Sequence, residues 1–130
     1  MRLSALGLKQ LLQQNVAEVH FSRRIPKAGY RITRRMLCTL DKHLLNSMAG
    51  RVALNFNNPV HPPAYPAQAY NLVTVYDLFW QDWRNVPAET LDVVSVIPSH
   101  TKPQQDAFWA YFSAFLSKLS PQDKEAFMNT

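Results

Sequence analysis

The stretch VAEVHFSRRIPKAGYRITRRMLCTL, residues 16–40, decides the fold of this chain. In its first part Ala17, Val19 and Phe21 share one parity, and polar residues separate them. Side chains of a strand point alternately to its two faces, so this period of two predicts a strand with one face in contact with water. Such a strand needs a neighbouring strand and a layer that covers its apolar face.

The segment after this strand predicts a hairpin. IPKAGY (25–30) supplies a proline and a glycine for a loop of a few residues. Ile32, Met36 and Cys38 then alternate against Arg31, Thr33 and Arg35, as a second strand requires. Arg34 breaks the alternation because it falls on the apolar parity, which indicates either a frayed strand start or a bulge that shifts the register.

The segments around the hairpin predict a small α+β domain. Residues 3–14 have leucines at roughly helical spacing, and RVALNF (51–56) and NLVTVYDLF (71–79) read as further strands. VPAETLDVVSVI (86–97) predicts a brief strand, a helical turn and a last strand. About five short antiparallel strands in this length indicate a small β-barrel, which we expect to occupy residues 1–98.

Two segments depart from the barrel pattern. Residues 57–70 form a proline-rich insertion, which predicts a flexible or binding loop. Residues 99–130 predict a helical tail whose aromatic face is broader than one contact surface needs. We expect the tail either to fold back on the barrel or to pair with its copy in another subunit. The residues predicted for oligomerisation are Phe108, Trp109, Tyr111, Phe112, Phe115, Leu116 and Leu119.

Motifs of catalysis and metal binding do not occur in the sequence. It contains no Gly-rich phosphate loop, no HExxH and no G-x-S-x-G, and its four histidines lack the spacing of metal ligands. Cys38 is the single cysteine and has the inward parity of its strand, where a small buried hydrophobe is expected. No apolar run is long enough to cross a membrane. We therefore expect a soluble, cytoplasmic, non-enzymatic protein without a cofactor or metal.

Positive charge is concentrated in the hairpin. The net charge is +5, but residues 1–70 hold ten bases and two acids, whereas residues 71–130 hold four bases and seven acids. A solvated strand edge predicts charges of both signs, yet no acid occurs between Glu18 and Asp41. Guanidinium groups suit phosphates and stack on bases, and a barrel has no recognition helix for a duplex groove, so a single strand is the expected ligand. The predicted nucleic-acid-binding residues are Arg23, Arg24, Lys27, Tyr30, Arg31, Arg34, Arg35, Arg51 and Trp80.

The stretches TRRMLCTL (33–40) and VTVYDLFWQDWRNVPAETLDVVSV (73–96) resemble a family of small phage proteins described as WYL-like domains with an Sm-like SH3 barrel. The most specific residues of the resemblance are Met36, Cys38, Thr39, Trp83 and Arg84. It covers roughly residues 8–97 and implies a small antiparallel SH3/Sm-like β-barrel preceded by a short helix. The proline-rich insertion and the helical tail lie outside the family pattern.

A second resemblance rests on size, the basic front half and the aromatic tail. It is to a single-stranded-DNA-binding transcription regulator of podophages that package their own RNA polymerase. It implies a phage protein of the host-cell cytoplasm that binds single-stranded nucleic acid, with DNA favoured, and acts in phage transcription or replication as a homo-oligomer, with an RNA polymerase as a possible partner.

The alternative hypothesis is a protein-interaction module, a host-takeover factor that binds an acidic protein such as a component of host transcription. Salt-sensitive binding of oligonucleotides favours the nucleic-acid hypothesis. Binding of one acidic protein, with negligible affinity for oligonucleotides, favours the alternative.

Overall fold

The structure is a computed structural model of the chain, and it describes residues 1–22, 33–54, 63 and 67–128. Its strands are β1 (Asn15–Phe21), β2 (Arg34–Thr39), β3 (Leu72–Asp77), β4 (Asp82–Pro87) and β5 (Asp92–Pro98). Its α-helices are α1 (Ala5–Leu12), α2 (Lys42–Leu45), α3 (Met48–Ala53), α4 (Lys102–Lys118) and α5 (Pro121–Met128). Two 3-10 turns, η1 (Ala67–Tyr70) and η2 (Ala88–Thr90), precede β3 and β5.

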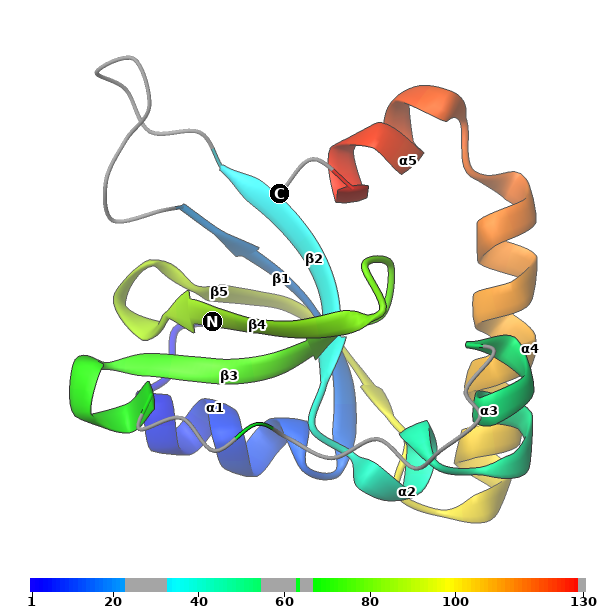
Figure 1. Ribbon diagram of the computed structural model, residues 1–130, viewed down its shortest axis with the longest axis horizontal. Coiled ribbons are helices and arrows are strands. Elements are labelled where there is room, and N and C mark those ends of the chain that lie inside the picture. The colour runs from blue at the N-terminus through cyan, green and yellow to red at the C-terminus, as the bar shows by residue number, and fades with distance from the viewer. Residues whose placement is uncertain (23–32, 55–62, 64–66, 129–130) are drawn as a thin grey trace.

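The five strands form one antiparallel sheet in the order β4-β3-β2-β1-β5 (Figure 1). Strands β1 to β4 follow one another as a meander, and β5 returns to pair with β1. The predicted α+β class and the antiparallel sheet are confirmed. Within the described residues β4 and β5 are the two edges of the sheet, so it is not closed by a pairing of its end strands.

The sheet bends at β2. This strand pairs with β1 from Arg34 to Thr39, but its register with β3 covers only Cys38 and Thr39. The hairpin of β1 and β2 therefore diverges from the hairpin of β3 and β4 (Figure 1). A register shift between β1 and β5 at Glu18 and Val19 adds to the curvature, because bulges bend a strand and increase its twist. The sheet thus has a curved inner face and an outer face.

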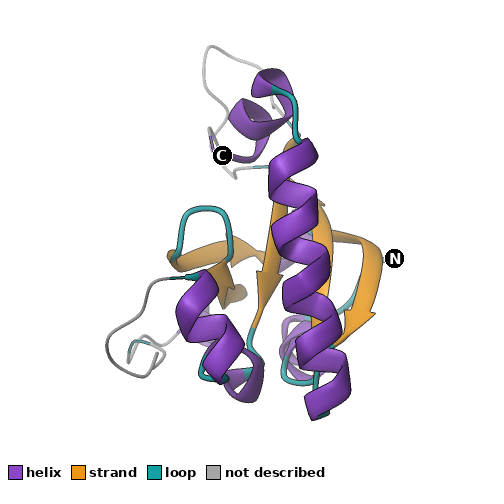
Figure 2. Cartoon of the chain, turned by 90° about the vertical axis from the view of Figure 1, so that its right-hand side faces the viewer, coloured by secondary structure: helices purple, strands orange, loops and turns teal. Residues whose placement is uncertain are grey.

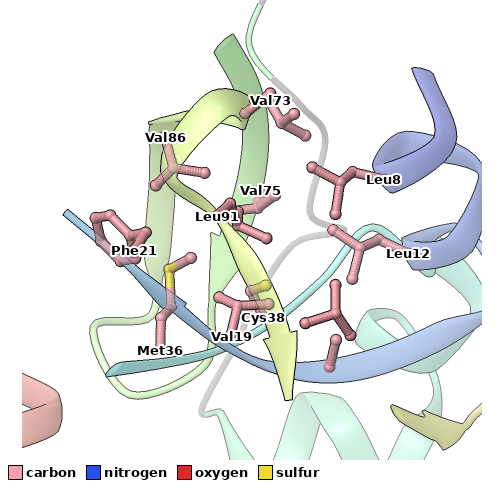
Figure 3. Close-up of a cluster of buried hydrophobic side chains, with 13 residues drawn as sticks. Leu8, Leu12, Val19, Phe21, Met36, Cys38, Val73, Val75, Val86 and Leu91 are labelled. Carbon is pink, nitrogen blue, oxygen red and sulfur yellow. The ribbon is translucent and has the colours of Figure 1, made fainter. Parts of the chain in front are cut away.

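Apolar side chains fill the inner face (Figure 3). Helix α1, which begins at the N-cap Ser4, packs Leu8 and Leu12 against it. The buried residues of this inner core are Leu8, Leu12, Ala17, Val19, Phe21, Met36, Cys38, Val73, Val75, Val86, Ala88, Leu91 and Val93. The inward parity predicted for Ala17, Val19, Phe21, Met36 and Cys38 is therefore confirmed, whereas Ile32 lies outside the described residues. Burial raises the pKa of the Cys38 thiol far above its usual range, so this thiol stays protonated and unreactive.

Helix α4 covers the outer face of the sheet, together with α2 and α3 (Figure 2). Phe108, Trp109 and Phe112 of α4 are buried there. The indole N–H of Trp109 donates hydrogen bonds to the carbonyl oxygen of Leu44 (3.2 Å) and to the hydroxyl of Ser47 (3.1 Å). The other buried residues of this outer core are Val16, Leu37, Leu44, Leu45, Leu54, Tyr76, Leu78 and Phe79.

This packing corrects the prediction that the aromatic face of the tail serves oligomerisation. Of the two alternatives, the tail folds back on its own sheet, and the rings of Phe108, Trp109 and Phe112 have no surface left for a second copy. Phe115 and Leu119 are partly buried against the same core. From the predicted set, Tyr111 and Leu116 are exposed.

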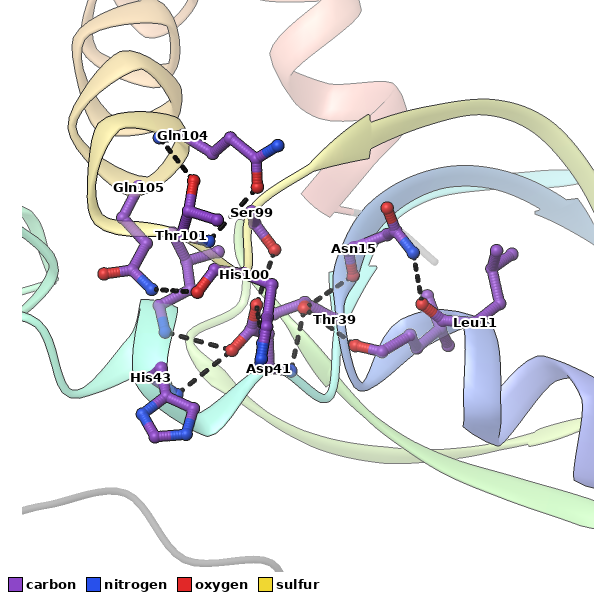
Figure 4. A network of polar contacts seen from close by, with 12 residues as sticks. Leu11, Asn15, Thr39, Asp41, His43, Ser99, His100, Thr101, Gln104 and Gln105 are labelled. Carbon is purple, nitrogen blue, oxygen red and sulfur yellow. Dashed lines mark hydrogen bonds and ion pairs between the residues drawn. The ribbon is translucent and has the colours of Figure 1, made fainter.

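A buried polar network begins at the end of β2 (Figure 4). The hydroxyl of Thr39 lies 2.9 Å from the carbonyl oxygen of Asn15 and 3.3 Å from that of Leu12. The same hydroxyl accepts a hydrogen bond from the backbone N–H of Asp41 (3.0 Å). Thr39 therefore joins the end of α1, the start of β1 and the start of α2.

Asp41 continues this network and is fully buried. Its carboxyl group accepts hydrogen bonds from the backbone of His43 (3.1 Å) and Leu44 (3.2 Å), which makes it the N-cap of α2. It also accepts a hydrogen bond from the hydroxyl of Ser99 (2.8 Å), in the link between β5 and α4. Asp41 thereby connects α2 to the start of the helix that covers the outer face.

The strand predicted for residues 51–56 is wrong in its described part. Met48–Ala53 is helix α3, and Leu54 follows it as the C-cap. The hydroxyl of Ser47 begins the helix, because it accepts a hydrogen bond from the backbone N–H of Gly50 (3.1 Å). None of the described helices is long and apolar enough to span a bilayer.

We expect Gly50→Ala to destabilise the fold by about 1–3 kcal/mol, because the added methyl group meets closely packed atoms. A Cβ atom at this position would lie 2.6 Å from the carbonyl oxygen of Leu44 and 2.8 Å from the Trp109 ring. Urea unfolding measures the loss. Gly7→Ala is the matched control, because its nearest neighbour is the Ser4 hydroxyl at 3.3 Å, and it should cost less. Equal effects of the two substitutions would contradict the close approach at Gly50.

We expect Asp41→Ala to lower the free energy of unfolding by about 2–4 kcal/mol, because a helix cap and a buried hydrogen bond are lost together. Asp106→Ala removes an exposed carboxylate that pairs with Lys102 at 3.0 Å, and it should change stability by about 0.5 kcal/mol or less. Denaturant titration of both variants tests the difference. A small effect at Asp41 would show that the fold does not depend on this junction.

Candidate nucleic-acid interface

The turn between β3 and β4 is organised by Asp77, the last residue of β3. Its side chain is 1% exposed. One carboxylate oxygen accepts hydrogen bonds from the backbone N–H groups of Phe79 and Trp80, both at 3.0 Å. Gln81 completes the turn with a left-handed backbone (φ 55°). The carboxylate therefore fixes the backbone of the turn that carries Trp80.

The other oxygen of Asp77 forms an ion pair with Arg84 of β4 (3.2 Å). Arg84 has the parity of the inner-core residue Val86, and its side chain is only 15% exposed. Its guanidinium carbon lies 4.9 Å from the centre of the Trp80 ring and 5.6 Å from that of Phe21. These distances are typical of cation–π contacts. Arg84 thus connects the turn to the last residue of β1, where the Arg-rich hairpin begins.

Burial raises the pKa of Asp77, and this cause outweighs the lowering by the Trp80 N–H, by the Arg84 hydrogen bond and charge, and by the Phe79 N–H. A carboxyl group with a raised pKa binds more protons in the folded than in the unfolded state. Its contribution to stability therefore falls as the pH rises from the unfolded pKa toward the folded pKa.

Arg34 and Arg35 are adjacent at the start of β2 and therefore point to opposite faces of the hairpin. Arg34 has the inner parity of Met36, is partly buried, and lies opposite Phe21 in the strand register. Arg84 contacts the rings of both Phe21 and Trp80. Arg34, Phe21, Arg84 and Trp80 therefore lie together at one end of the inner face. We call these four residues the hairpin-base cluster.

Arg35 lies on the outer face and is partly neutralised. Its guanidinium forms an ion pair with the carboxylate of Glu18 on β1 (3.0 Å). The sequence has no acid between Glu18 and Asp41, but Glu18 itself meets the basic hairpin at this position. Glu18 lies 17 positions away in the sequence, but the antiparallel register brings it beside Arg35.

The remaining predicted residues are not all in one place. Arg51 is on α3, which follows the far end of β2 and packs beside α4, so the structure does not bring it to the hairpin base. Trp80 is 43% exposed and belongs to the hairpin-base cluster. The predicted residues Arg23, Arg24, Lys27, Tyr30 and Arg31 lie outside the described residues, as does most of the proline-rich segment 57–70.

Sequence reasoning did not assign Asp77 and Arg84 to the site. A signal was present, because both residues have the apolar parity of their strands: Asp77 follows Val73 and Val75, and Arg84 precedes Val86. A pair of opposite charges on the inward parity of neighbouring strands indicates a buried ion pair.

The described residues contain no group of three or more His, Cys, Asp or Glu side chains arranged to hold a metal ion. Comparison of the chain with family models, with curated proteins and with solved structures finds no match. The interpretation of the site therefore rests on its own geometry.

The raised pKa of Asp77 can be tested with Asp77→Asn, which keeps an oxygen acceptor for the turn but cannot ionise. The unfolding free energy of the unmodified chain should fall relative to that of the variant as the pH rises above about 4. Urea titrations of both proteins between about pH 4 and 7 measure this difference. A difference that changes in the opposite direction would show that the Arg84 pair outweighs the cost of burial.

Proposed function

We propose that this is a non-catalytic protein that binds single-stranded nucleic acid, with single-stranded DNA the favoured ligand, through its Arg-rich hairpin. The observation that carries the proposal is the hairpin-base cluster. It brings Arg34, which lies opposite Phe21, and the exposed ring of Trp80, which Arg84 contacts, to one end of the inner face. Cations for phosphates and an aromatic ring for bases are the two components of single-strand sites.

A single strand fits this arrangement better than a duplex. The cluster lies on three strands and a turn, not on a helix that could enter a major groove. A curved sheet with an exposed aromatic ring suits unstacked bases, whose faces are accessible only when the strand is not paired. Non-specific contacts to phosphates predict weak sequence preference and strong salt dependence.

We further propose that the sheet is of the SH3/Sm-like type and that the chain is related to the WYL-like phage domains. Three features support this: the short helix before β1, the four-strand meander, and the return of β5 to β1. The proposed setting is phage transcription or replication in the host cytoplasm, with an RNA polymerase as a partner. Self-association is also part of the proposal, and Tyr111 and Leu116 are the predicted residues exposed for it.

A second candidate function, binding of an acidic protein partner as a host-takeover factor, is favoured by one observation. Met48 and Val52, four residues apart on α3, are 83% and 77% exposed. Apolar side chains on one side of a helix are typical of a protein contact rather than a phosphate contact.

Fluorescence anisotropy with a labelled oligo-dT of about 30 nucleotides, at two salt concentrations and beside a duplex of the same length, tests the first proposal. We expect binding of the single strand that weakens as salt increases. Negligible binding of both oligonucleotides would reject the nucleic-acid function and leave the protein partner as the remaining candidate.

The two neighbouring arginines should differ in this assay. Arg34→Ala should lower the affinity several-fold and reduce the salt slope by about 1, because it removes one phosphate-binding cation from the hairpin base. Arg35→Ala should have a smaller effect, because Glu18 already neutralises much of that charge. Glu18→Gln is the complementary variant and should raise the affinity by releasing Arg35. Equal losses from both arginine variants would contradict this division of the hairpin into two faces.

A further inference from the structure

We propose that Trp80 is the platform on which one nucleobase stacks, and that Arg84 is a positioning residue that holds the Trp80 ring from the inner side. This inference rests on the proposed function and names the part of the ligand that the site recognises. The hairpin cations can attract any polyanion, whereas a stacking platform requires a ligand with a base.

The first observation is the difference in exposure between the two residues. Trp80 is 43% exposed as a residue, whereas the Arg84 side chain is 15% exposed and is already paired with Asp77. Arg84 lies 4.9 Å from the ring centre and is largely covered from solvent. The indole therefore offers area to a ligand, while Arg84 supports the ring from within the fold.

The second observation is that one buried carboxylate fixes both parts of the platform. Asp77 accepts a hydrogen bond from the backbone N–H of Trp80 (3.0 Å) and pairs with the guanidinium that contacts the Trp80 ring (3.2 Å). The position of the ring is thus set from its backbone and from its π face. A ring held in this way loses little conformational entropy when a base stacks on it.

The third observation is that the platform is continuous with the hairpin. The guanidinium of Arg84 also lies 5.6 Å from the ring of Phe21, the last residue of β1, and Phe21 lies opposite Arg34. A strand whose phosphates contact Arg34 therefore has a base within reach of the turn. The ligand class is a single-stranded oligonucleotide that carries bases, in contrast to an abasic or other base-free polyanion.

The test compares oligo-dT with an abasic strand of the same length, which has the same phosphates and no bases. The unmodified protein should bind oligo-dT roughly ten-fold more tightly. We call the affinity for oligo-dT divided by the affinity for the abasic strand the base ratio. Trp80→Ala should bind both strands as weakly as the unmodified protein binds the abasic strand, so its ratio should fall to about 1. Trp80→Phe should restore most of the ratio, because phenylalanine supplies a smaller π face. Trp83→Phe is the matched control and should leave the ratio unchanged, since Trp83 packs on Tyr76.

Arg84→Met tests the positioning role. It should lower the ratio of the two affinities while the affinity for the abasic strand stays nearly constant, which a general loss of stability would not produce. Arg84→Lys, which keeps a cation beside the ring, should recover part of the ratio, and thermal unfolding of both variants shows whether they are folded.

Each other outcome is decisive. A normal ratio in Trp80→Ala would overturn the stacking site while leaving the proposed function in place. If Arg84→Met kept the preference of the unmodified protein for oligo-dT over the abasic strand while Trp80→Ala lost it, only the role of Arg84 would be rejected. Failure of the unmodified protein to bind either strand would reject the proposed function itself.

Discussion

The two layers on either side of the sheet depend on one buried junction, the side chains of Thr39 and Asp41. Through Thr39, the end of β2 is fixed to the end of α1 and the start of β1, which positions the inner core. Through Asp41 and Ser99, the same point is fixed to the segment that starts α4, which positions the outer core. Burial of these polar groups is tolerated because each finds hydrogen-bond partners within the chain.

The antiparallel sheet can be predicted from the sequence where apolar and polar residues alternate clearly. The alternation Ala17, Val19, Phe21 identifies the inner face of β1, and these residues are in the inner core. The strand predicted from residue 51 is a helix in its described part, since short apolar runs do not distinguish a strand from a helical turn and the cap at Ser47 lies outside that segment. Whether the aromatic tail packs on its own sheet or on a copy depends on tertiary contacts that no local pattern encodes.

The candidate site was harder to predict than the fold, because it depends on strand register. Charge counting along the sequence identifies the hairpin and groups Arg34 and Arg35 as binding residues of equal standing. The register separates them and gives Arg35 the carboxylate of Glu18. Asp77 and Arg84 differ from this case, because their sequence neighbourhood suggests exposed charges. Their inward parity and the pairing of β3 with β4 instead place them together as a largely buried ion pair.

The three tryptophans lie in three different environments, which gives the molecule its own optical reporters. Trp109 is buried and its indole N–H is hydrogen-bonded, Trp83 is partly buried against Tyr76, and Trp80 is exposed beside a guanidinium. Indole emission shifts to longer wavelengths as the ring meets water. Single-tryptophan forms of the chain would therefore report separately on the packing of α4 and on the surface at the hairpin base.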